Sequence, residues 1–227
     1  MSADPKTQTD PERDCPRCPR LVDFREKWRT AHPQWHNAPV ATFSAAEPQL
    51  LILGLAPGIR GANATGRPFT GDYAGDLLYA TLKKFGFASG DYQARVDDGL
   101  TLVDAAITNA VRCVPPDNKP VGAEINACRP FLQNTLHANT SIQIVLALGR
   151  IAHETFLRML GLRLAAYPFS HGAIHRLPEW QSRSFTLVDS YHCSRYNTNT
   201  RRLTPEMFES VFQDIRDLID ESTEPGR

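Results

Sequence analysis

Four short apolar runs, separated by longer segments with helical spacing, constrain the fold of this chain more than any other feature. The runs cover residues 49–54, 102–109, 142–148 and 185–191. Apolar residues recur at helical spacing in the segments around them, over 21–30, 76–85, 123–137, 151–160 and 205–219. Strands that alternate with helices form parallel β/α layers. The sequence therefore predicts an α/β fold in which four parallel strands alternate with helices.

The chain has 227 residues, which suits one α/β domain with one substantial core. We expect a disordered leader over residues 1–14, a single domain over 15–220 and a flexible tail over 221–227. The leader is polar and acidic and lacks the basic and apolar regions of a signal peptide. With no apolar run of membrane-spanning length, we expect a cytoplasmic monomer without membrane contact. Basic and acidic residues balance at 25 each, so net charge neither favours nor excludes nucleic acid.

Polar and glycine-rich loops follow two of the predicted strands, at points far apart in the chain. The first strand runs into Gly54-Leu-Ala-Pro-Gly58 and then Gly66-Arg-Pro-Phe-Thr-Gly-Asp72. The last strand runs into Tyr191-His-Cys-Ser-Arg-Tyr-Asn197. Because open α/β sheets bind ligands beyond the carboxyl ends of their strands, we expect both loops to meet at one pocket.

The residue types in these loops restrict the class of ligand that this pocket could bind. The first loop has neither the Gly-Lys-Ser/Thr of a phosphate-binding loop nor a G-x-G-x-x-G fingerprint, so a planar ligand stacked on Phe69 fits better. Asn109 ends the second strand, where it either satisfies buried backbone groups or reads the edge of a base. His192 is either a core histidine or a functional one, and its place beside Ser194 and Asn197 favours function. The remaining histidines show no ligand spacing: His32, His36, His137, His153, His171 and His175.

The chain has five cysteines, and a reducing compartment disfavours structural disulfides, so four of these thiols suggest a metal or cluster site. Cys15 and Cys18 form a Cys-x-x-Cys pair, and Cys113 and Cys128 follow with fourteen residues between them. This spacing leaves three readings open, which are a four-thiolate iron–sulfur cluster, a zinc site and unliganded thiols. A redox Cys-x-x-Cys is disfavoured, because such a pair should follow a strand at a helix start, whereas this pair follows a polar leader.

Taken in order, these motifs resemble a known family. The segments CPRC, GLAPG, GRPFTGD, NAVRC, ALGRIAH and HCSRYNTNTRRLT are similar to those of the uracil-DNA glycosylase superfamily, specifically its family 5, the iron–sulfur "b" class. The resemblance covers residues 15–215. It implies an α/β fold with three layers, α/β/α, around a central four-stranded parallel sheet. It also implies a structural [4Fe–4S] cluster on Cys15, Cys18, Cys113 and Cys128. One departure is Cys193, where the family usually has proline.

The resemblance also implies roles for individual residues. Asp72 matches the acid that positions or activates water, Asn109 the reader of the uracil edge, and His192 the donor to uracil O2 that stabilises the leaving anion. Further residues match the base pocket: Gly54, Ala56, Phe69, which stacks on the flipped base, and Asn197. The loop Ser194–Arg202 matches the segment that wedges into duplex DNA, with four candidate DNA contacts: Ser194, Arg195, Arg201 and Arg202.

The implied activity is excision of uracil from DNA by hydrolysis of the N-glycosidic bond, which leaves an abasic site. Hypoxanthine and other deaminated bases are further candidate substrates. One alternative is a catalytically silent nucleic-acid-binding domain of the same fold, against which Asp72 and His192 argue. A second alternative, a zinc-stapled α/β hydrolase, lacks its nucleophile signature G-x-S-x-G.

Overall fold

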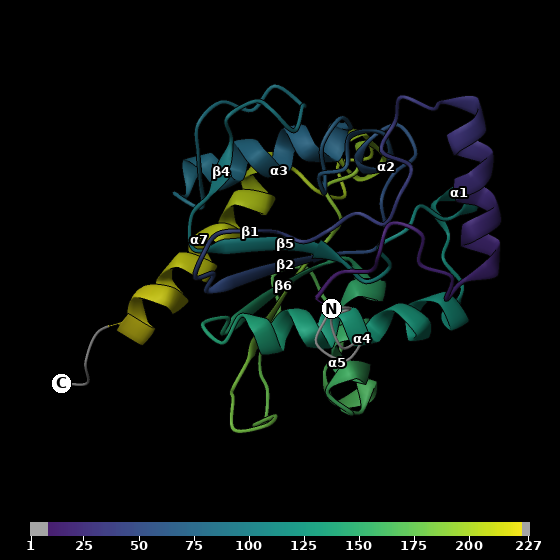
Figure 1. Cartoon of the computed structure of the whole chain (residues 1–227). Helices are drawn as coiled ribbons and strands as arrows, with labels where there is room; N and C mark the ends of the chain where they lie inside the picture. Colours follow the sequence, from purple (N-terminus) through teal and green to yellow (C-terminus); the bar gives the residue numbers. More distant parts are fainter. Residues whose placement is uncertain (1–8, 224–227) are drawn as a thin grey trace.

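The computed structural model describes residues 9–223, and within them six strands form one mixed sheet (Figure 1). Their order is β1-β5-β2-β6-β8-β7. The four central strands are parallel, namely β5 (Ala105–Asn109), β2 (Leu50–Gly54), β6 (Ile144–Leu148) and β8 (Thr186–Ser190). The predicted four-stranded parallel core is therefore confirmed. Two short antiparallel strands that the sequence did not predict close the edges, β1 (Phe43–Ser44) and β7 (Ile174–Arg176).

The second predicted strand, over 102–109, is split in the structure. Thr101–Leu102 forms β4, which pairs with β3 (Ala88–Ser89) in a separate two-stranded sheet. Asp104 has a φ of 51°, in the left-handed region. A non-glycine residue with this φ cannot continue an extended strand, so β5 begins only at Ala105.

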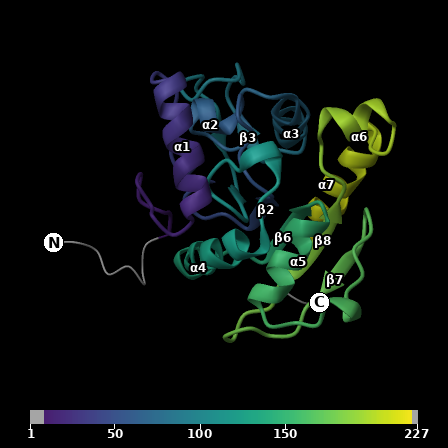
Figure 2. The same cartoon turned by 90° about the vertical axis from the view of Figure 1, so that its right-hand side faces the viewer.

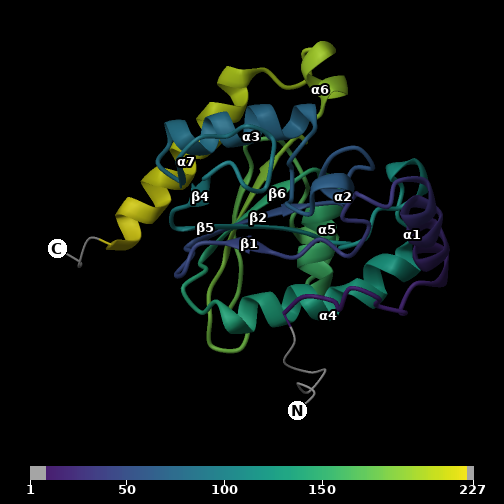
Figure 3. The ribbon, with the colours of Figure 1, turned by 45° about the horizontal axis from the view of Figure 1, so that its top comes forward.

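Helices cover both faces of the sheet (Figures 1 and 3). On one face lie α3 (Tyr73–Lys84) and α7 (Pro205–Thr223), whose apolar sides pack with Leu50, Ile52 and Val188 in one core cluster. On the other face lie α4 (Gly122–Ala138) and α5 (Arg150–Met159), which share a second cluster with Leu51, Leu53 and Val145. Alternate residues of β2 thus enter opposite clusters, as the two-residue period of a strand requires.

Three further helices lie where the central strands end (Figure 2). They are α1 (Pro19–Ala31), α2 (Ala62–Thr65) and α6 (Arg195–Asn199). The loop after β2 leads into α2, and the loop after β8 leads into α6. The carboxyl end of the sheet is therefore bordered by the segments that the sequence marked as chemically distinctive. No helix within the described residues is long and apolar enough to cross a membrane.

The ends of the domain differ from the expected boundaries. Residues 1–8 of the expected leader lie outside the described residues, but Asp10 accepts hydrogen bonds from the Thr42 backbone N–H (2.9 Å) and from Arg112 Nη1 (2.5 Å). Arg112 is 1% exposed, so the packed part of the chain begins before Cys15. At the other end α7 continues to Thr223. The expected tail is helical at its start, and residues 224–227 lie outside the described part.

Candidate active site at the carboxyl ends of the strands

A cavity of about 620 Å³ opens where β2, β5 and β8 end. Its lining comes from three separate parts of the chain and includes seven of the residues that the sequence marked: Ala56, Phe69, Asp72, Asn109, His192, Ser194 and Arg195. The two loops that are far apart in the chain therefore do meet. A cavity of this size is within the usual range for sites that bind small molecules.

Asn109 and Phe69 pack against Gly54 at the base of this cavity. Gly54 pairs with Asn109 across β2 and β5. A Cβ at residue 54 would lie 2.3 Å from Asn109 Oδ1 and 2.8 Å from the Phe69 ring, so only glycine fits here. Asn109 is 3% exposed, and its side-chain amide makes no hydrogen bond within the described part of the chain. Asn109 lines the cavity, so a ligand with a matching polar edge could pair with its amide.

Phe69 is held in a strained backbone conformation. Its φ is 52°, a region that costs about 1–3 kcal/mol for a residue other than glycine. Two tyrosine hydroxyls fix the carbonyls on either side of this strain. Tyr79 donates to Pro68 O at 2.6 Å, and Tyr92 donates to Phe69 O at 3.3 Å. A Cβ at Gly75 would lie 1.8 Å from Phe69 O, so the start of α3 also closes on this backbone.

An ion pair stands behind the same loop. Arg67 donates to both carboxylate oxygens of Asp98, at 2.8 and 2.7 Å, and its Nε donates to Thr70 Oγ1 at 2.8 Å. The two charged side chains are 6% and 0% exposed. Asp98 also accepts from the backbone N–H groups of Gln93 and Leu100. The hydrogen bonds from Arg67 hold the pKa of Asp98 well below its usual range. This pair ties the loop of Phe69 to the segment 91–100.

Asp72 directly precedes α3 as its N-cap residue, and its side chain caps the helix. Oδ1 accepts from the Gly75 backbone N–H at 3.2 Å. The other oxygen faces two glycines, since a Cβ at Gly61 would lie 2.4 Å from Oδ2 and one at Gly58 would lie 3.2 Å away. Burial raises the pKa of Asp72, although the hydrogen bond from Gly75 acts in the opposite direction. The missing side chains of these glycines leave room for the carboxylate on the cavity wall.

His192 borders the cavity opposite this loop. Its ring contacts Phe69, with 5.8 Å between the ring centroids and 29° between the planes. Burial lowers the pKa of His192 to about 4, so the imidazole is neutral at neutral pH. No residue of the described chain makes a hydrogen bond to its ring. A neutral imidazole in this setting keeps one N–H to donate and one nitrogen to accept.

Asn197 supports His192 from outside the cavity. Its side-chain Nδ2 donates to the backbone oxygen of His192 at 2.8 Å, and its own N–H points to Ser194 Oγ at 3.4 Å. Ser194 thereby caps the short helix α6. Asn197 lines a neighbouring cavity of about 300 Å³ rather than the main one. It is therefore placed to orient the histidine loop and not to touch a ligand beside Phe69.

The three arginines of the segment 194–202 lie in different surroundings. Arg195 lies over the Tyr73 ring at 5.4 Å and borders the main cavity. Arg202 lies over the Tyr191 ring at 4.5 Å and borders the neighbouring cavity. Arg201 is exposed, has a φ of 56° and borders neither of these two cavities. Tyr196, which is 72% exposed, projects from α6. The expected loop is thus a capped helical turn with a basic residue at each end.

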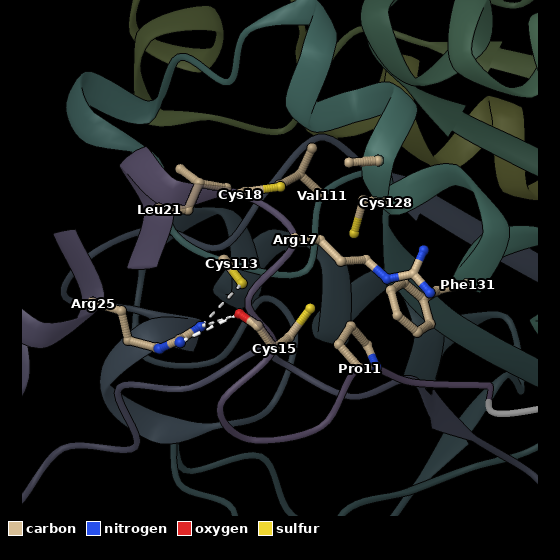
Figure 4. Close-up of a pocket in the computed structure, with 11 residues that line it drawn as sticks. Pro11, Cys15, Arg17, Cys18, Leu21, Arg25, Val111, Cys113, Cys128 and Phe131 are labelled. Carbon is tan, nitrogen blue, oxygen red and sulfur yellow. Dashed lines mark hydrogen bonds between the residues drawn. The ribbon is translucent and has the colours of Figure 1, made fainter. Parts of the chain in front are cut away.

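The paired and single cysteines come together away from this cavity (Figure 4). Four of them line one pocket together with Arg17 and Arg25, namely Cys15, Cys18, Cys113 and Cys128. Cys15 and Cys18 precede α1, Cys113 follows β5, and Cys128 lies on α4. Burial raises the pKa of Cys18 to about 11 and that of Cys113 to about 12. Cys193 is fully buried in a different cluster, where its Sγ donates to Ala74 O at 3.4 Å.

The geometry of the cysteine pocket distinguishes between possible occupants. Tetrahedral zinc with Zn–S bonds of about 2.3 Å requires sulfur atoms about 3.8 Å apart. Within the described chain, no three of these sulfur atoms lie within 4.8 Å of one another. Arg25 is 2% exposed, and its Nε has no hydrogen-bond partner. Its Nη1 lies 4.0 Å from Cys113 Sγ, and the Arg112 backbone N–H donates to Cys128 Sγ at 3.3 Å. Four widely spaced cysteines beside a buried cation are compatible with an anionic cluster.

Comparison with known proteins places this arrangement in a family. The model of the uracil DNA glycosylase superfamily matches residues 41–216. A type-5 uracil-DNA glycosylase of Thermus thermophilus is 43% identical over 210 residues, which are 90% of this chain and 93% of that protein. Type-5 enzymes of Mycobacterium leprae and Pyrobaculum aerophilum are 38% and 35% identical, over 90% and 88% of this chain and 91% and 87% of their own. The chain belongs to the uracil-DNA glycosylase superfamily.

Within this superfamily the chain is more similar to the type-5 proteins than to the type-4 proteins. A type-4 uracil-DNA glycosylase of Archaeoglobus fulgidus is 27% identical over 173 residues. The resemblance inferred from the motifs is therefore confirmed at the level of the type-5 family. The roles of individual residues stay predictions, and the structure adds where each of them lies.

Sequence reasoning missed the residues that hold this glycosylase-like site in shape. The loop of Phe69 is supported by the Arg67–Asp98 ion pair and by the hydroxyls of Tyr79 and Tyr92. The Tyr73 ring packs against the guanidinium of Arg195. Asp98 lies 31 residues after Arg67, too far for any helix or strand period to connect them. The one available signal was a charged residue in each of two segments that otherwise read as loop.

Proposed function

We propose that this protein is a uracil-DNA glycosylase that turns uracil out of DNA and hydrolyses its N-glycosidic bond, leaving an abasic site. The observation that carries the proposal is the meeting of Asn109, Phe69 and His192 in one cavity of a chain from this superfamily. A base inside a duplex cannot reach such a cavity, so the nucleotide must be flipped out. Flipping costs a few kcal/mol and least at mismatches.

Asn109 and Phe69 recognise the flipped base in this proposal. The Phe69 ring supplies a stacking surface, and base–aromatic stacking is worth about 1–3 kcal/mol per base. The amide of Asn109 offers one acceptor and donors, which suit the N3–H and O4 edge of uracil. Cytosine presents the opposite pattern at these positions, so a fixed amide discriminates against it. Gly54 permits this arrangement because a side chain there would overlap both residues.

His192 acts on the charge that develops as the bond breaks. The departing uracil becomes anionic at O2, and a neutral imidazole can donate an N–H to that oxygen. The low pKa of His192, about 4, keeps the ring neutral at physiological pH. A hydrogen bond that strengthens only in the transition state accelerates the reaction and does not merely tighten binding. Asn197 fixes the histidine backbone from behind through its bond to His192 O.

Asp72 orients the water that attacks the sugar. Its carboxylate borders the cavity beside Gly58 and Gly61, and an anion there also stabilises the cationic character of the sugar in the transition state. Because burial raises the pKa of Asp72, its active form is lost at a higher pH than for an exposed aspartate. The hydrogen bond from Gly75 N–H holds Oδ1 in place.

DNA contacts in this proposal come from the segment after His192. Ser194 and Arg195 border the main cavity, and Arg202 borders its neighbour, so these residues follow the strand on either side of the flipped nucleotide. Arg201 contacts the backbone only from the outer side of this segment. Phosphate contacts of this kind are independent of sequence and weaken with salt. The proposed partner is therefore DNA that contains uracil, bound by one copy of the chain.

Four cysteines hold a structural [4Fe–4S] cluster in this proposal: Cys15, Cys18, Cys113 and Cys128. The cluster would supply no step of the hydrolysis and would link the segment before α1 to the loop after β5 and to α4. Its fit rests on the buried cation Arg25 and the N–H donors that face the sulfur atoms. All five cysteines are free of disulfides, which suits a reducing compartment such as the cytoplasm.

The test uses DNA with a single uracil opposite guanine, under single-turnover conditions. His192→Ala should slow excision by about 10²-fold or more, the usual cost of one such donor, while binding to abasic DNA stays nearly unchanged. Asn109→Ala should remove uracil excision in the same assay. A duplex with hypoxanthine in place of uracil measures the base range. Wild-type protein that binds DNA without releasing uracil would establish the silent binding domain in place of the enzyme.

A further inference from the structure

Two histidines and an aspartate meet on the side of the sheet that α5 covers, away from the proposed active-site cavity. They are His153 of α5, His175 of β7 and Asp189 of β8. One ligand atom from each lies within 4.8 Å of the other two. His153 and Asp189 are 1% and 0% exposed, and the side chain of His175 is 13% exposed. We propose that this trio, named the β8 triad below, binds one divalent zinc ion.

The orientation of His153 is the first support for the proposal. Its Nε2 lies 2.9 Å from the backbone oxygen of Tyr167. A carbonyl oxygen only accepts, so Nε2 carries the proton and donates it. When a metal ion replaces any proton on Nδ1, the Nδ1 lone pair therefore points toward the ion between His153 and Asp189. Histidines that ligate metals usually donate their other N–H to a carbonyl or carboxylate in this way, which fixes the tautomer and the ring.

The surroundings of Asp189 are the second support. Its Oδ1 lies 2.7 Å from His153 Nδ1, and its Oδ2 lies 3.3 Å from His175 Nε2. In the described chain these two imidazoles are the only side chains that hydrogen-bond to its carboxylate, and no lysine or arginine forms an ion pair with it. A lone pair and a carboxylate oxygen repel each other unless a positive charge, from a proton or from a metal cation, lies between them. A divalent cation supplies that charge to both contacts at once.

The ligand set selects the kind of ion. Two imidazole nitrogens and one carboxylate oxygen favour zinc and related transition metals, whereas magnesium and calcium prefer oxygen alone. Zinc bonds of about 2.0–2.2 Å to nitrogen and oxygen require ligand atoms about 3.3 Å apart. The His175–Asp189 contact already has this spacing, and the 2.7 Å contact of His153 needs only a small opening. The partly exposed side of His175 leaves a fourth position for water.

Bound zinc would link β7 to α5 and β8, and β7 itself has no fully buried residue. β7 is a three-residue edge strand, and its residues have the burial pattern exposed, intermediate, exposed. The chain between α5 and β7 forms a short 3₁₀ turn (Leu164–Ala166) and otherwise has no regular structure. An ion on His153, His175 and Asp189 fixes this stretch to the end of β8, three residues before His192. The role inferred for it is stabilisation, and no step of base excision requires it.

The test measures zinc in the full chain with its cysteine site already loaded, so that thiols do not capture the added ion. Wild-type protein should take up one further equivalent of zinc on titration, measured by calorimetry and by elemental analysis after desalting. Its thermal midpoint should rise in the presence of zinc, because an ion that binds only the folded state stabilises it. Cobalt in place of zinc should give visible bands of a nitrogen- and oxygen-ligated ion without thiolate charge transfer.

His175→Gln is the principal variant, because its partly exposed side chain can change with little effect on folding. Loss of an outer-shell partner lowers metal affinity by about 10–100-fold, so loss of a ligand should weaken zinc binding by at least that factor. Asp189→Asn should do the same, and far-ultraviolet circular dichroism shows whether it folds. The matched control is His137→Gln, which alters an exposed histidine on α4 and should leave zinc uptake unchanged.

Three results would overturn the inference. They are wild-type protein that takes up no zinc beyond the cysteine site, equal affinity in His175→Gln and wild type, or a cobalt spectrum dominated by thiolate charge transfer. In each case the β8 triad is a hydrogen-bonded cluster only. None of these readouts depends on uracil excision, so this inference and the proposed function stand or fall separately.

Discussion

Replacement of Asp98 by asparagine tests whether the ion pair behind Phe69 holds the base pocket in shape. The carboxylate accepts two hydrogen bonds from Arg67 and two from backbone N–H groups. Both side chains are almost fully buried. Removal of one partner from a buried ion pair costs about 3–5 kcal/mol, because the other charge stays buried without compensation. Asparagine keeps an acceptor for only one of the two backbone donors, since Gln93 N–H and Leu100 N–H donate to different oxygens, so we expect a loss of about 3 kcal/mol or more.

Urea unfolding followed by circular dichroism measures this loss, and its pH dependence identifies the cause. Arg67 holds the pKa of Asp98 below its usual range. A depressed carboxyl pKa stabilises the fold above its unfolded value, about 3.9, and this stabilisation is lost as the pH falls toward the folded value. The difference between wild type and Asp98→Asn should therefore be complete at neutral pH and shrink below about pH 4. The control Asp97→Asn removes an exposed carboxylate beside Arg95 and should cost less than about 0.5 kcal/mol.

Excision kinetics then show whether the pair acts through Phe69. With Arg67 released, the strained backbone at Phe69 loses a support, and stacking worth about 1–3 kcal/mol is weakened. Single-turnover excision should slow in Asp98→Asn at a temperature where the variant is folded. The double variant with Phe69→Ala should be no slower than Phe69→Ala alone, because both changes remove one interaction. Additive losses, or a stability change as small as that of Asp97→Asn, would refute this reasoning.

Four further predictions concern the site and the cysteine pocket. Gly54→Ala should abolish uracil excision with little change in DNA binding, since its methyl group would occupy the space of Asn109 Oδ1 at 2.3 Å; full activity would exclude a base from this position. The rate should fall with decreasing pH as Asp72 protonates, at a pH above that of an ordinary aspartate because its pKa is raised. Asp72→Asn should lose this pH limb while the fold stays at least as stable, which denaturation checks. Cys113→Ser should lose iron and visible absorbance and Cys193→Ser should keep both; equal iron in the two variants would remove Cys113 from the cluster. Arg195→Ala should slow excision more from U·A than from U·G pairs, because the mismatch opens more easily, and equal slowing would show that Arg195 does not help to open the pair.

Elements with strong local patterns were predictable from the sequence, and those defined by tertiary contacts were not. The central strands were found because buried parallel strands are continuous apolar runs. β7 has three residues and β1 has two, too few for a period to register. α6 lacks an apolar face and depends on its Ser194 cap, so its sequence resembles a loop. Asp104 interrupts the second predicted strand through its backbone conformation, which composition does not reveal.

The candidate site shows the same division. Residues at strand ends, such as Asn109 and His192, were identifiable because strand ends meet in a parallel sheet. The different surroundings of Arg201 and Arg202 could not be predicted, because the backbone turns at Arg201 with a positive φ. The β8 triad was missed because its members come from three elements, and no spacing in the sequence connects His153 with His175 and Asp189.

The order in which the cysteine pocket and the sheet are completed has a consequence for biosynthesis. A ribosome that has translated residue 140 has made all four pocket cysteines, together with β2 and β5, which pair directly. It has not yet made β6, which pairs with the other side of β2, or β8, which precedes His192. The thiols that join α1 to α4 are thus available while the nascent chain still lacks half of its central sheet. Iron delivery during translation would find a partly folded acceptor, and the residue proposed to release the base would emerge only afterwards.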